Sequence, residues 1–191
     1  MEIDINTKII KGITYIPSPN HDERSDPEDI YLLVIHGISL PPNRFGGPYI
    51  EHLFTNCLNP SEHPFFKEIE HLRVSSHLLI RRGGEIVQFV PLNKRAWHAG
   101  VSSFKGREQC NDFSIGIELE GTDETPYESE QYESLIKVTG LIQSIYPKVT
   151  LENIAGHCDI APGRKTDPGP FFDWSVYKNG LGIHGDKTHF E

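Results

Sequence analysis

The sequence predicts an α/β or α+β domain, because stretches typical of β-strands alternate with stretches typical of helices along the chain. Residues 30–36 form an uninterrupted apolar run, residues 113–120 alternate apolar and polar side chains, and residues 125–146 carry apolar side chains at helical spacing. The 191 residues suffice for one domain with a substantial core. No repeat, low-complexity tract or linker divides the chain, so we expect a single domain over residues 1–191.

The composition argues against binding to nucleic acid or to a membrane surface, because the formal net charge is −9. No apolar run approaches the roughly 20 residues that a membrane-spanning helix needs. The first residues lack the basic and apolar segments of a signal peptide. The three cysteines, Cys57, Cys110 and Cys158, are odd in number and widely spaced, which favours a reducing compartment. We therefore expect a cytoplasmic protein, with no nucleic-acid or membrane partner and a monomer favoured.

The first predicted buried element is a strand over residues 30–36, which follows a polar and turn-rich segment, residues 1–29, expected to wrap the surface. The length and β-branched content of this run fit a strand that is buried on both faces. His36 ends the run, and ligands of α/β sheets gather outside the carboxyl ends of strands. His36 is therefore either a site residue or a hydrogen-bonded structural histidine.

Between this strand and residue 100 we expect a helix, a loop and a hairpin. Pro48 suits the first turn of a helix. Residues 59–66 read as a loop with a possible short helix, and two β-rich runs flank Gly83 and Gly84 as in a hairpin. Trp97 and His98 form either a platform for a sugar or a packed corner. The apolar residues at helical spacing after Pro48, which we expect in the core, are Ile50, Leu53, Phe54 and Cys57.

The alternating run, residues 113–120, predicts a half-buried strand with two carboxylates on its polar face. These carboxylates belong to Glu118 and Glu120, and alternation alone does not decide which of them has a function. The apolar face consists of Phe113, Ile115, Ile117 and Leu119, and the polar face also contains Ser114 and Gly116.

A scaffolding helix is predicted over residues 125–146, where Thr125 and Glu128 fit a capping box and Pro147 stops the helix. Residues 171–174 follow as an aromatic anchor. The tail from Lys178 is polar and expected to be mobile, and its histidines, His184 and His189, receive no role.

The segment 154–170 is predicted to be a loop because of its prolines and glycines, and it carries groups suited to chemistry. It offers His157 and Asp167 as possible metal ligands, with the cation Lys165 between them. If the segment is extended, Lys165 and Asp167 point to the same face. The alternative is a surface loop with solvated charges.

Two histidines and one carboxylate, here His36, His157 and Asp167, are a complete protein ligand set for catalytic zinc, whose fourth position is taken by water. Zinc lowers the pKa of that water to about 7. Glu118 could then act as general base and later protonate the leaving amine, while Lys165 stabilises the oxyanion. The spacing in the sequence does not show that these five residues converge.

A basic stretch runs from Arg73 to Arg107, with seven Lys or Arg residues against the single acid Glu85. A local charge of +6 in an acidic protein suggests a site for an anionic small ligand. The alternative is a solvated hairpin face.

Several motifs together resemble the zinc N-acetylmuramoyl-L-alanine amidases, and among them the AmpD-type 1,6-anhydro-N-acetylmuramyl-L-alanine amidases of cell-wall recycling. The resemblance covers about residues 17–177, which we take as the core of the domain, with a polar N-terminal extension and a C-terminal tail outside it. The motifs are Leu33–His36, Trp97–Gly100, Asn111–Gly121 and Gly156–Pro170, extended by Ile38–Pro42, Phe45–Pro48 and His71–Ser75.

The resemblance implies a mixed central β-sheet flanked by helices, as in phage amidases and peptidoglycan recognition proteins. It implies one zinc ion held by His36, His157 and Asp167, with Glu118 and Lys165 as catalytic residues. The implied reaction is hydrolysis of the amide between the muramyl lactyl group and L-Ala of a soluble anhydromuropeptide.

Substrate contacts are a further expectation. The peptide stem bears carboxylates, so Arg73 is a candidate clamp, since arginine matches carboxylate geometry bidentately. Trp97 and His98 are expected to line the sugar side. One departure from the family is visible, because Gly37 follows the first metal histidine where relatives usually carry Asn. The competing hypotheses are a lytic amidase that acts on intact murein and a non-catalytic muropeptide-binding module.

Overall fold

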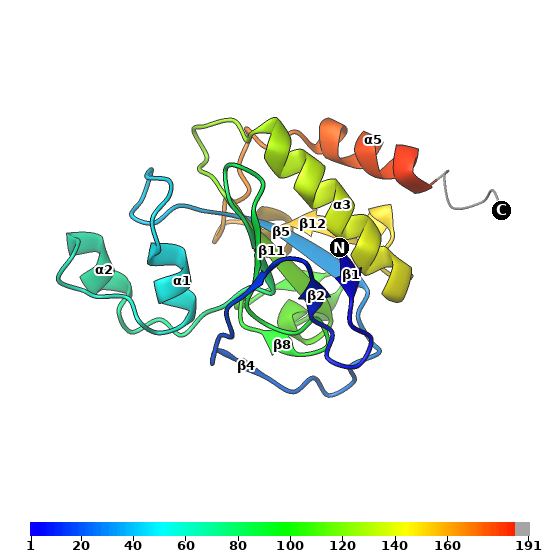
Figure 1. Cartoon of the computed structure of the whole chain (residues 1–191), viewed down its shortest axis with the longest axis horizontal. Helices are drawn as coiled ribbons and strands as arrows, with labels where there is room; N and C mark the ends of the chain where they lie inside the picture. Colours follow the sequence, from blue (N-terminus) through cyan, green and yellow to red (C-terminus); the bar gives the residue numbers. More distant parts are fainter. Residues whose placement is uncertain (186–191) are drawn as a thin grey trace.

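The computed structural model describes residues 1–185, and its centre is a six-stranded mixed β-sheet (Figure 1). All neighbouring strands run parallel except one antiparallel pair, which is the hairpin predicted around Gly83 and Gly84. The predicted mixed sheet flanked by helices is therefore confirmed. In spatial order the strands are β12 (Ile154–Gly156), β5 (Leu32–Ile38), β11 (Ser114–Glu120), β6 (Leu78–Ile80), β7 (Ile86–Gln88) and β3 (Thr14–Tyr15).

Helices α3 (Ser129–Ile145) and α5 (Trp174–Gly185) pack against each other and cover one face of the sheet (Figure 1). The side chains of Leu33 and Ile35 from β5 enter this layer together with Ile115 and Ile117 from β11. Phe172, which precedes α5 in the sequence, contacts four aromatic rings, those of Tyr127, Tyr132, Trp174 and Tyr177. The predicted aromatic anchor is thus confirmed.

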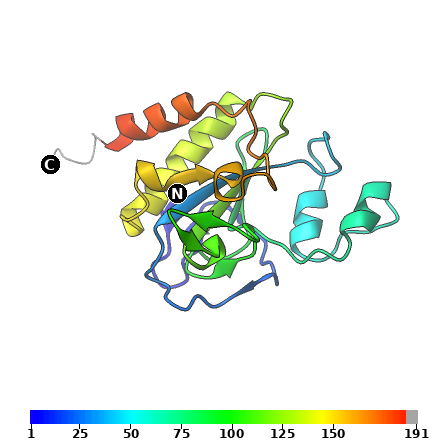
Figure 2. The ribbon, with the colours of Figure 1, turned by 180° about the vertical axis from the view of Figure 1, so that it is seen from behind.

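The opposite face is covered by the segment between β7 and β11, which lies behind the sheet in Figure 1 and in front of it in Figure 2. Helices α1 (Tyr49–Phe54) and α2 (Pro64–Ile69) project at one end of the molecule in both views and pack against β6 and β7. The remaining short elements are β1 (Glu2–Ile3), β2 (Ile10–Lys11), β4 (His21–Asp22), β8 (Arg95–Ala96), β9 (Ser103–Phe104), β10 (Arg107–Glu108), η1 (Cys110–Asp112), η2 (Leu151–Asn153) and α4 (His157–Ile160).

The strand over residues 113–120 is not half-buried, as its alternation predicts, but buried on both faces. Its polar face is covered by distant parts of the chain: the ring of His98 lies on Gly116, and the backbone amide of Gly46 donates to Glu120. The prediction of a half-buried strand is wrong because small and polar side chains on one face are compatible with two situations. Solvent can cover that face, or other segments of the protein can cover it, as they do here. The strand predicted over residues 30–36 is buried as expected, although β5 continues to Ile38.

The helix predicted over residues 125–146 begins one turn later, at Ser129. Glu128 is its N-cap and Gln131 completes the capping box, whereas Thr125 forms a β-bridge with Thr122. The helix after Pro48 ends at Phe54, so Cys57 is exposed and not in the core, unlike the other residues predicted with it.

The two ends of the chain are more structured than the composition suggests. Ile3 and Ile10 are buried in the main core, and β3 adds an edge strand to the sheet. The tail predicted to be mobile from Lys178 is helical up to Gly185, because the buried Leu181 packs in the layer with α3. His189 lies outside the described residues.

Candidate metal and catalytic site

The site lies at the carboxyl ends of three adjacent parallel strands, where ligands of such sheets usually bind. His36 is near the end of β5, and Glu118 stands directly beside it in the register of β11. His157 is the first residue of α4, immediately after β12. Segment 154–170 is therefore not a loop throughout, because its first part forms β12 and α4 and only the part after Ile160 lacks regular structure.

Asp167 is held beside the two histidines by the backbone, because its carbonyl accepts a hydrogen bond of 2.9 Å from the amide of Cys158. The Nδ1 atoms of His36 and His157 lie 2.9 Å apart, and Asp167 Oδ2 lies 3.3 Å from the first and 3.1 Å from the second. One ligand atom from each residue falls within 4.8 Å of the others. The structure thus brings together the three residues expected to bind metal.

The hydrogen bonds around His157 show which of its nitrogens could bind a metal. Its Nε2 lies 3.0 Å from the carbonyl oxygen of Ala99, which can only accept, so Nε2 carries the proton. A neutral ring then presents a bare Nδ1 toward Asp167 and His36. Lone pairs that converge in this way need a positive charge between them, as a proton or a metal ion. Burial lowers the pKa of His36 to about 4, which disfavours the proton there. The residues present therefore fit a divalent metal ion.

Glu118 has the environment of a carboxyl group that transfers protons. Its side chain is buried, with Oε1 4.0 Å from His36 Nδ1, and its Oε2 has no hydrogen-bond partner within residues 1–185. Burial, and then the charge of Asp167, raise the pKa of Glu118 well above its ordinary value. Burial also raises the pKa of the Asp167 carboxyl, but its interactions with His157 and His36 outweigh this effect and hold that pKa well below its usual range.

Glu120, the other carboxylate on this face, has a structural role. It accepts hydrogen bonds from the backbone amide of Gly46 at 2.6 Å and from Arg81 Nη1 at 3.3 Å. These bonds attach the segment after β5 to the sheet. The structure therefore distinguishes the two carboxylates that alternation left equivalent.

A cavity of about 270 Å³ opens over these groups. Glu118, Lys165 and Asp167 line it on one side, and Trp97 lines it together with an apolar wall from α1, α2 and their flanks. Lys165 is exposed and also borders an adjoining polar hollow that contains Asp123. The apolar residues of the lining, besides Trp97, are Ile38, Leu40, Leu53, Phe54, Phe65, Ile69, Leu72 and Val74.

The structure places both residues expected on the sugar side at the cavity, in different environments. Both Trp97 and His98 line the cavity, but His98 is largely buried and uses both ring nitrogens in hydrogen bonds inside the protein. His98 Nδ1 lies 2.9 Å from His36 Nε2, and His98 Nε2 lies 3.2 Å from Ser114 Oγ. Burial, and then the nearby His36, lower the pKa of His98 well below its ordinary value.

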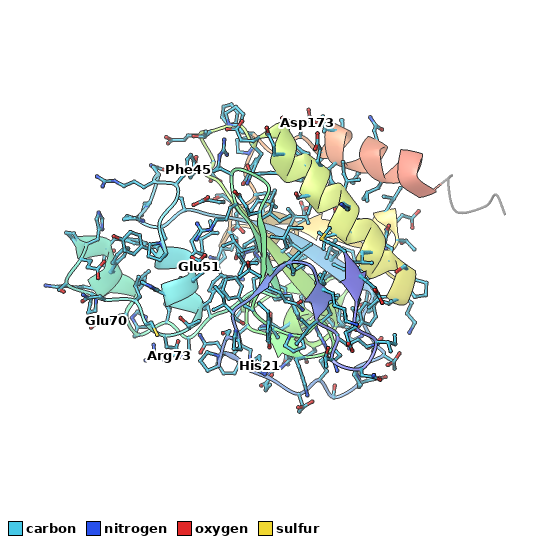
Figure 3. The ribbon with its side chains drawn as sticks, in the orientation of Figure 1. His21, Phe45, Glu51, Glu70, Arg73 and Asp173 are labelled. Atoms are coloured by element: carbon cyan, nitrogen blue, oxygen red, sulfur yellow. The ribbon has the colours of Figure 1, made fainter. Side chains whose placement is uncertain are left out.

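Arg73 is exposed and does not line the cavity. Its Nη1 donates to the backbone carbonyls of Glu70 and Leu72 at 3.0 and 2.9 Å, and Figure 3 shows Arg73 and Glu70 near one another beneath the two short helices. Five of the seven cations in the basic stretch form ion pairs with acids from outside it, which favours a structural reading of most of this charge. Within the described residues, Arg73 has no carboxylate partner.

Tyr127 is a site residue that the sequence pattern does not reveal. It is buried, and its hydroxyl donates a 2.9 Å hydrogen bond to the carbonyl of Pro168, next to Asp167. A Cβ atom at Gly37 would lie 2.4 Å from this hydroxyl, so Tyr127 occupies the space of a side chain at position 37. The departure at Gly37 is the only signal in the sequence, and it does not point to a residue 90 positions away.

A family model described as N-acetylmuramoyl-L-alanine amidase matches residues 26–170. The 1,6-anhydro-N-acetylmuramyl-L-alanine amidase AmpD of Escherichia coli K12 is 60% identical over 167 residues, which cover 87% of this chain and 91% of that protein. The AmpD protein of Haemophilus influenzae is 55% identical over 174 residues, covering 91% of this chain and 95% of that protein.

Solved structures show the same similarity. A crystal structure of an AmpD selenomethionine derivative superposes with a TM-score of 0.91 at 55% identity, covering 95% of this chain and 99% of that one. The amidase AmiD of Escherichia coli, in complex with anhydro-N-acetylmuramic acid-L-Ala-D-γ-Glu-L-Lys, superposes with a TM-score of 0.59 at 31% identity, covering 80% of this chain and 57% of that one.

Proposed function

The chain belongs to the N-acetylmuramoyl-L-alanine amidase family, and from this premise we propose that it is a zinc-dependent amidase that acts on soluble 1,6-anhydromuropeptides. The reaction is hydrolysis of the amide bond between the lactyl group of 1,6-anhydro-N-acetylmuramic acid and L-Ala. The convergence of His36, His157 and Asp167 beside the buried carboxyl group of Glu118 supports this function.

His36 Nδ1, His157 Nδ1 and Asp167 Oδ2 would hold the metal. When bound, zinc supplies a Lewis acid that polarises a carbonyl oxygen and lowers the pKa of water. Glu118 accepts the proton of the attacking water and then gives it to the leaving amine, a role that suits a carboxyl group with a raised pKa. Lys165 stabilises the negative charge that develops on the carbonyl oxygen.

The rest of the cavity suits an amphiphilic substrate. Trp97 and the apolar wall offer a surface for a sugar ring. The exposed Arg73 lies between the lining residues Leu72 and Val74 in the sequence, and the donors of its guanidinium other than Nη1 are available to a carboxylate of the peptide stem. Within residues 1–185, no helix has the length and apolar character needed to cross a membrane. We propose one domain over residues 1–191, active as a monomer in the cytoplasm.

The test is to incubate the purified protein with 1,6-anhydroMurNAc-tripeptide, before and after chelation and with zinc added back, and to follow free peptide by mass spectrometry. We expect zinc-dependent release of a peptide whose amino-terminal residue is L-Ala. No release at full zinc occupancy would contradict an amidase and favour a muropeptide-binding module. Equal activity on sacculi would favour a lytic amidase.

A further inference from the structure

We propose that His98 is a positioning residue for the metal ligand His36, and that a hydrogen-bond relay from Cys110 through Ser114 and His98 fixes the tautomer that presents His36 Nδ1 to the metal. The inference rests on the metal site proposed above. It assigns His98 a role inside the protein in addition to its position in the cavity lining.

The relay begins at the carbonyl oxygen of Cys110, which can only accept. Ser114 Oγ lies 2.5 Å from this oxygen, so the Ser114 hydroxyl must donate its single proton there. The oxygen of Ser114 then has only lone pairs to offer to the next group, His98 Nε2, at 3.2 Å. His98 Nε2 therefore carries a proton and donates it to Ser114.

The same direction of hydrogen-bond donation extends through the imidazole rings of His98 and His36. His98 is buried and faces no carboxylate among its hydrogen-bond partners, and such a ring is neutral because an unpaired buried charge is costly. With its proton on Nε2, its Nδ1 is bare and accepts from His36 Nε2 at 2.9 Å. The proton of neutral His36 is thus held on Nε2, and its Nδ1 is left bare toward His157 and Asp167.

The position of the His98 ring is fixed by its surroundings. A Cβ atom at Gly116 would lie 2.6 Å from both Cγ and Nδ1 of His98, so only glycine at this position of β11 lets the ring reach His36. The backbone amides of His98 and Ala99 both donate to the side-chain oxygen of Asn111, at 3.1 and 2.8 Å, which fixes the backbone that carries the ring.

The two histidine ligands are thus oriented by different means. His157 donates directly to the backbone carbonyl of Ala99, which no substitution removes. His36 depends on two side chains, those of His98 and Ser114. Since loss of such an outer hydrogen-bond partner typically weakens metal binding about 10- to 100-fold, substitution of His98 should be measurable in metal affinity alone.

The experiment compares zinc dissociation constants, measured by competition with a chelating indicator, for His98→Leu, His98→Gln and Ser114→Ala. Leu cannot accept from His36, and we expect its zinc affinity to fall about 10- to 100-fold. Gln can accept from His36 with its oxygen and donate to Ser114 with its amide, so we expect it to recover most of the affinity. Ser114→Ala should show an intermediate loss. The matched control is His71→Leu, which replaces an exposed histidine and should bind zinc like the parent.

A second readout does not involve metal. Nitrogen-15 NMR of the metal-free parent should show a proton on His36 Nε2 and on His98 Nε2, whether or not a further proton lies between the converging ligand atoms, and His98→Leu should show a mixture of His36 tautomers. Parent-like zinc affinity in folded His98→Leu, or a His36 ring without a proton on Nε2 in the parent, would overturn the relay. If His98→Leu does not fold, Ser114→Ala and the parent spectrum still decide. Failure of the parent to bind zinc would refute the proposed metal site instead, a result that the tautomer measurement distinguishes.

Discussion

Replacement of Glu118 by Gln should separate catalysis from metal binding and from stability. Gln has nearly the same shape but transfers no proton, and a positioned general base contributes about 100- to 10,000-fold to rate. At 1.36 kcal/mol per factor of ten, the barrier should rise by about 3 to 5 kcal/mol. Zinc affinity should hardly change, because the nearer oxygen of Glu118 lies 4.0 Å from His36 Nδ1 and is not among the converging ligand atoms.

The same substitution should stabilise the metal-free protein at neutral pH. Burial raises the pKa of Glu118 above its ordinary value of 4.5 in the folded state, so the folded protein binds this proton more tightly than the unfolded chain does. The free energy of unfolding of the parent therefore falls as pH rises from about 4.5 through the raised pKa. The Gln variant has no group that titrates at this position and does not show this loss. The free energies of unfolding should agree at low pH and diverge above it, with Glu118→Gln the more stable.

The assay combines peptide release, zinc competition and urea denaturation of the metal-free proteins across pH. Glu130→Gln, a change at an exposed carboxylate in the first turn of α3, is the matched control for loss of one charge and should leave the rate of peptide release unaltered. A Glu118→Gln enzyme that retains the parent's rate would refute Glu118 as the proton-transfer group. A variant with equal or lower stability at neutral pH would refute the argument from burial.

Three further outcomes are expected. Asp167→Asn should reduce zinc affinity and peptide release together, because the converging oxygen loses its charge; unchanged zinc binding would remove Asp167 from the ligand set. Arg73→Ala should raise KM about tenfold at unchanged kcat, from the loss of one charge-assisted hydrogen bond of about 1.5 kcal/mol, whereas Lys67→Ala, at an exposed position of α2, should not; equal KM values for Arg73→Ala and the parent would contradict the clamp hypothesis. Tyr127→Phe leaves the Pro168 carbonyl without its hydroxyl donor and should cost about 1 to 3 kcal/mol of unfolding free energy, which a parent-like denaturation curve would contradict.

The sequence reveals the strands that carry the site because their hydrophobic patterns are local. The apolar run before His36 and the alternation around Glu118 each indicate a strand, and the parallel register then sets the two residues side by side. Alternation could not choose between Glu118 and Glu120, because the choice depends on Gly46 and Arg81, which reach the strand from elsewhere in the chain.

His98 shows why other parts could not be predicted. A histidine beside a tryptophan fits either a sugar platform or a packed corner, and the missing side chain of Gly116, on a different strand, creates the space that the His98 ring occupies. The helical tail has the same explanation, because polar residues from Lys178 onward conceal the burial of Leu181 in the layer with α3. Such contacts join segments far apart in the sequence and leave no periodic pattern.

The close approach of Gly37 and Tyr127 couples these two positions energetically. Any side chain introduced at position 37 meets a buried and hydrogen-bonded hydroxyl, so it must displace the ring at a cost of about 1 to 3 kcal/mol for overpacking. A residue with an amide at position 37 avoids this cost where the residue at position 127 lacks the hydroxyl or the ring moves aside. The free energies of unfolding of Gly37→Asn and Tyr127→Phe should therefore be non-additive in the double variant, and additive values would contradict the coupling.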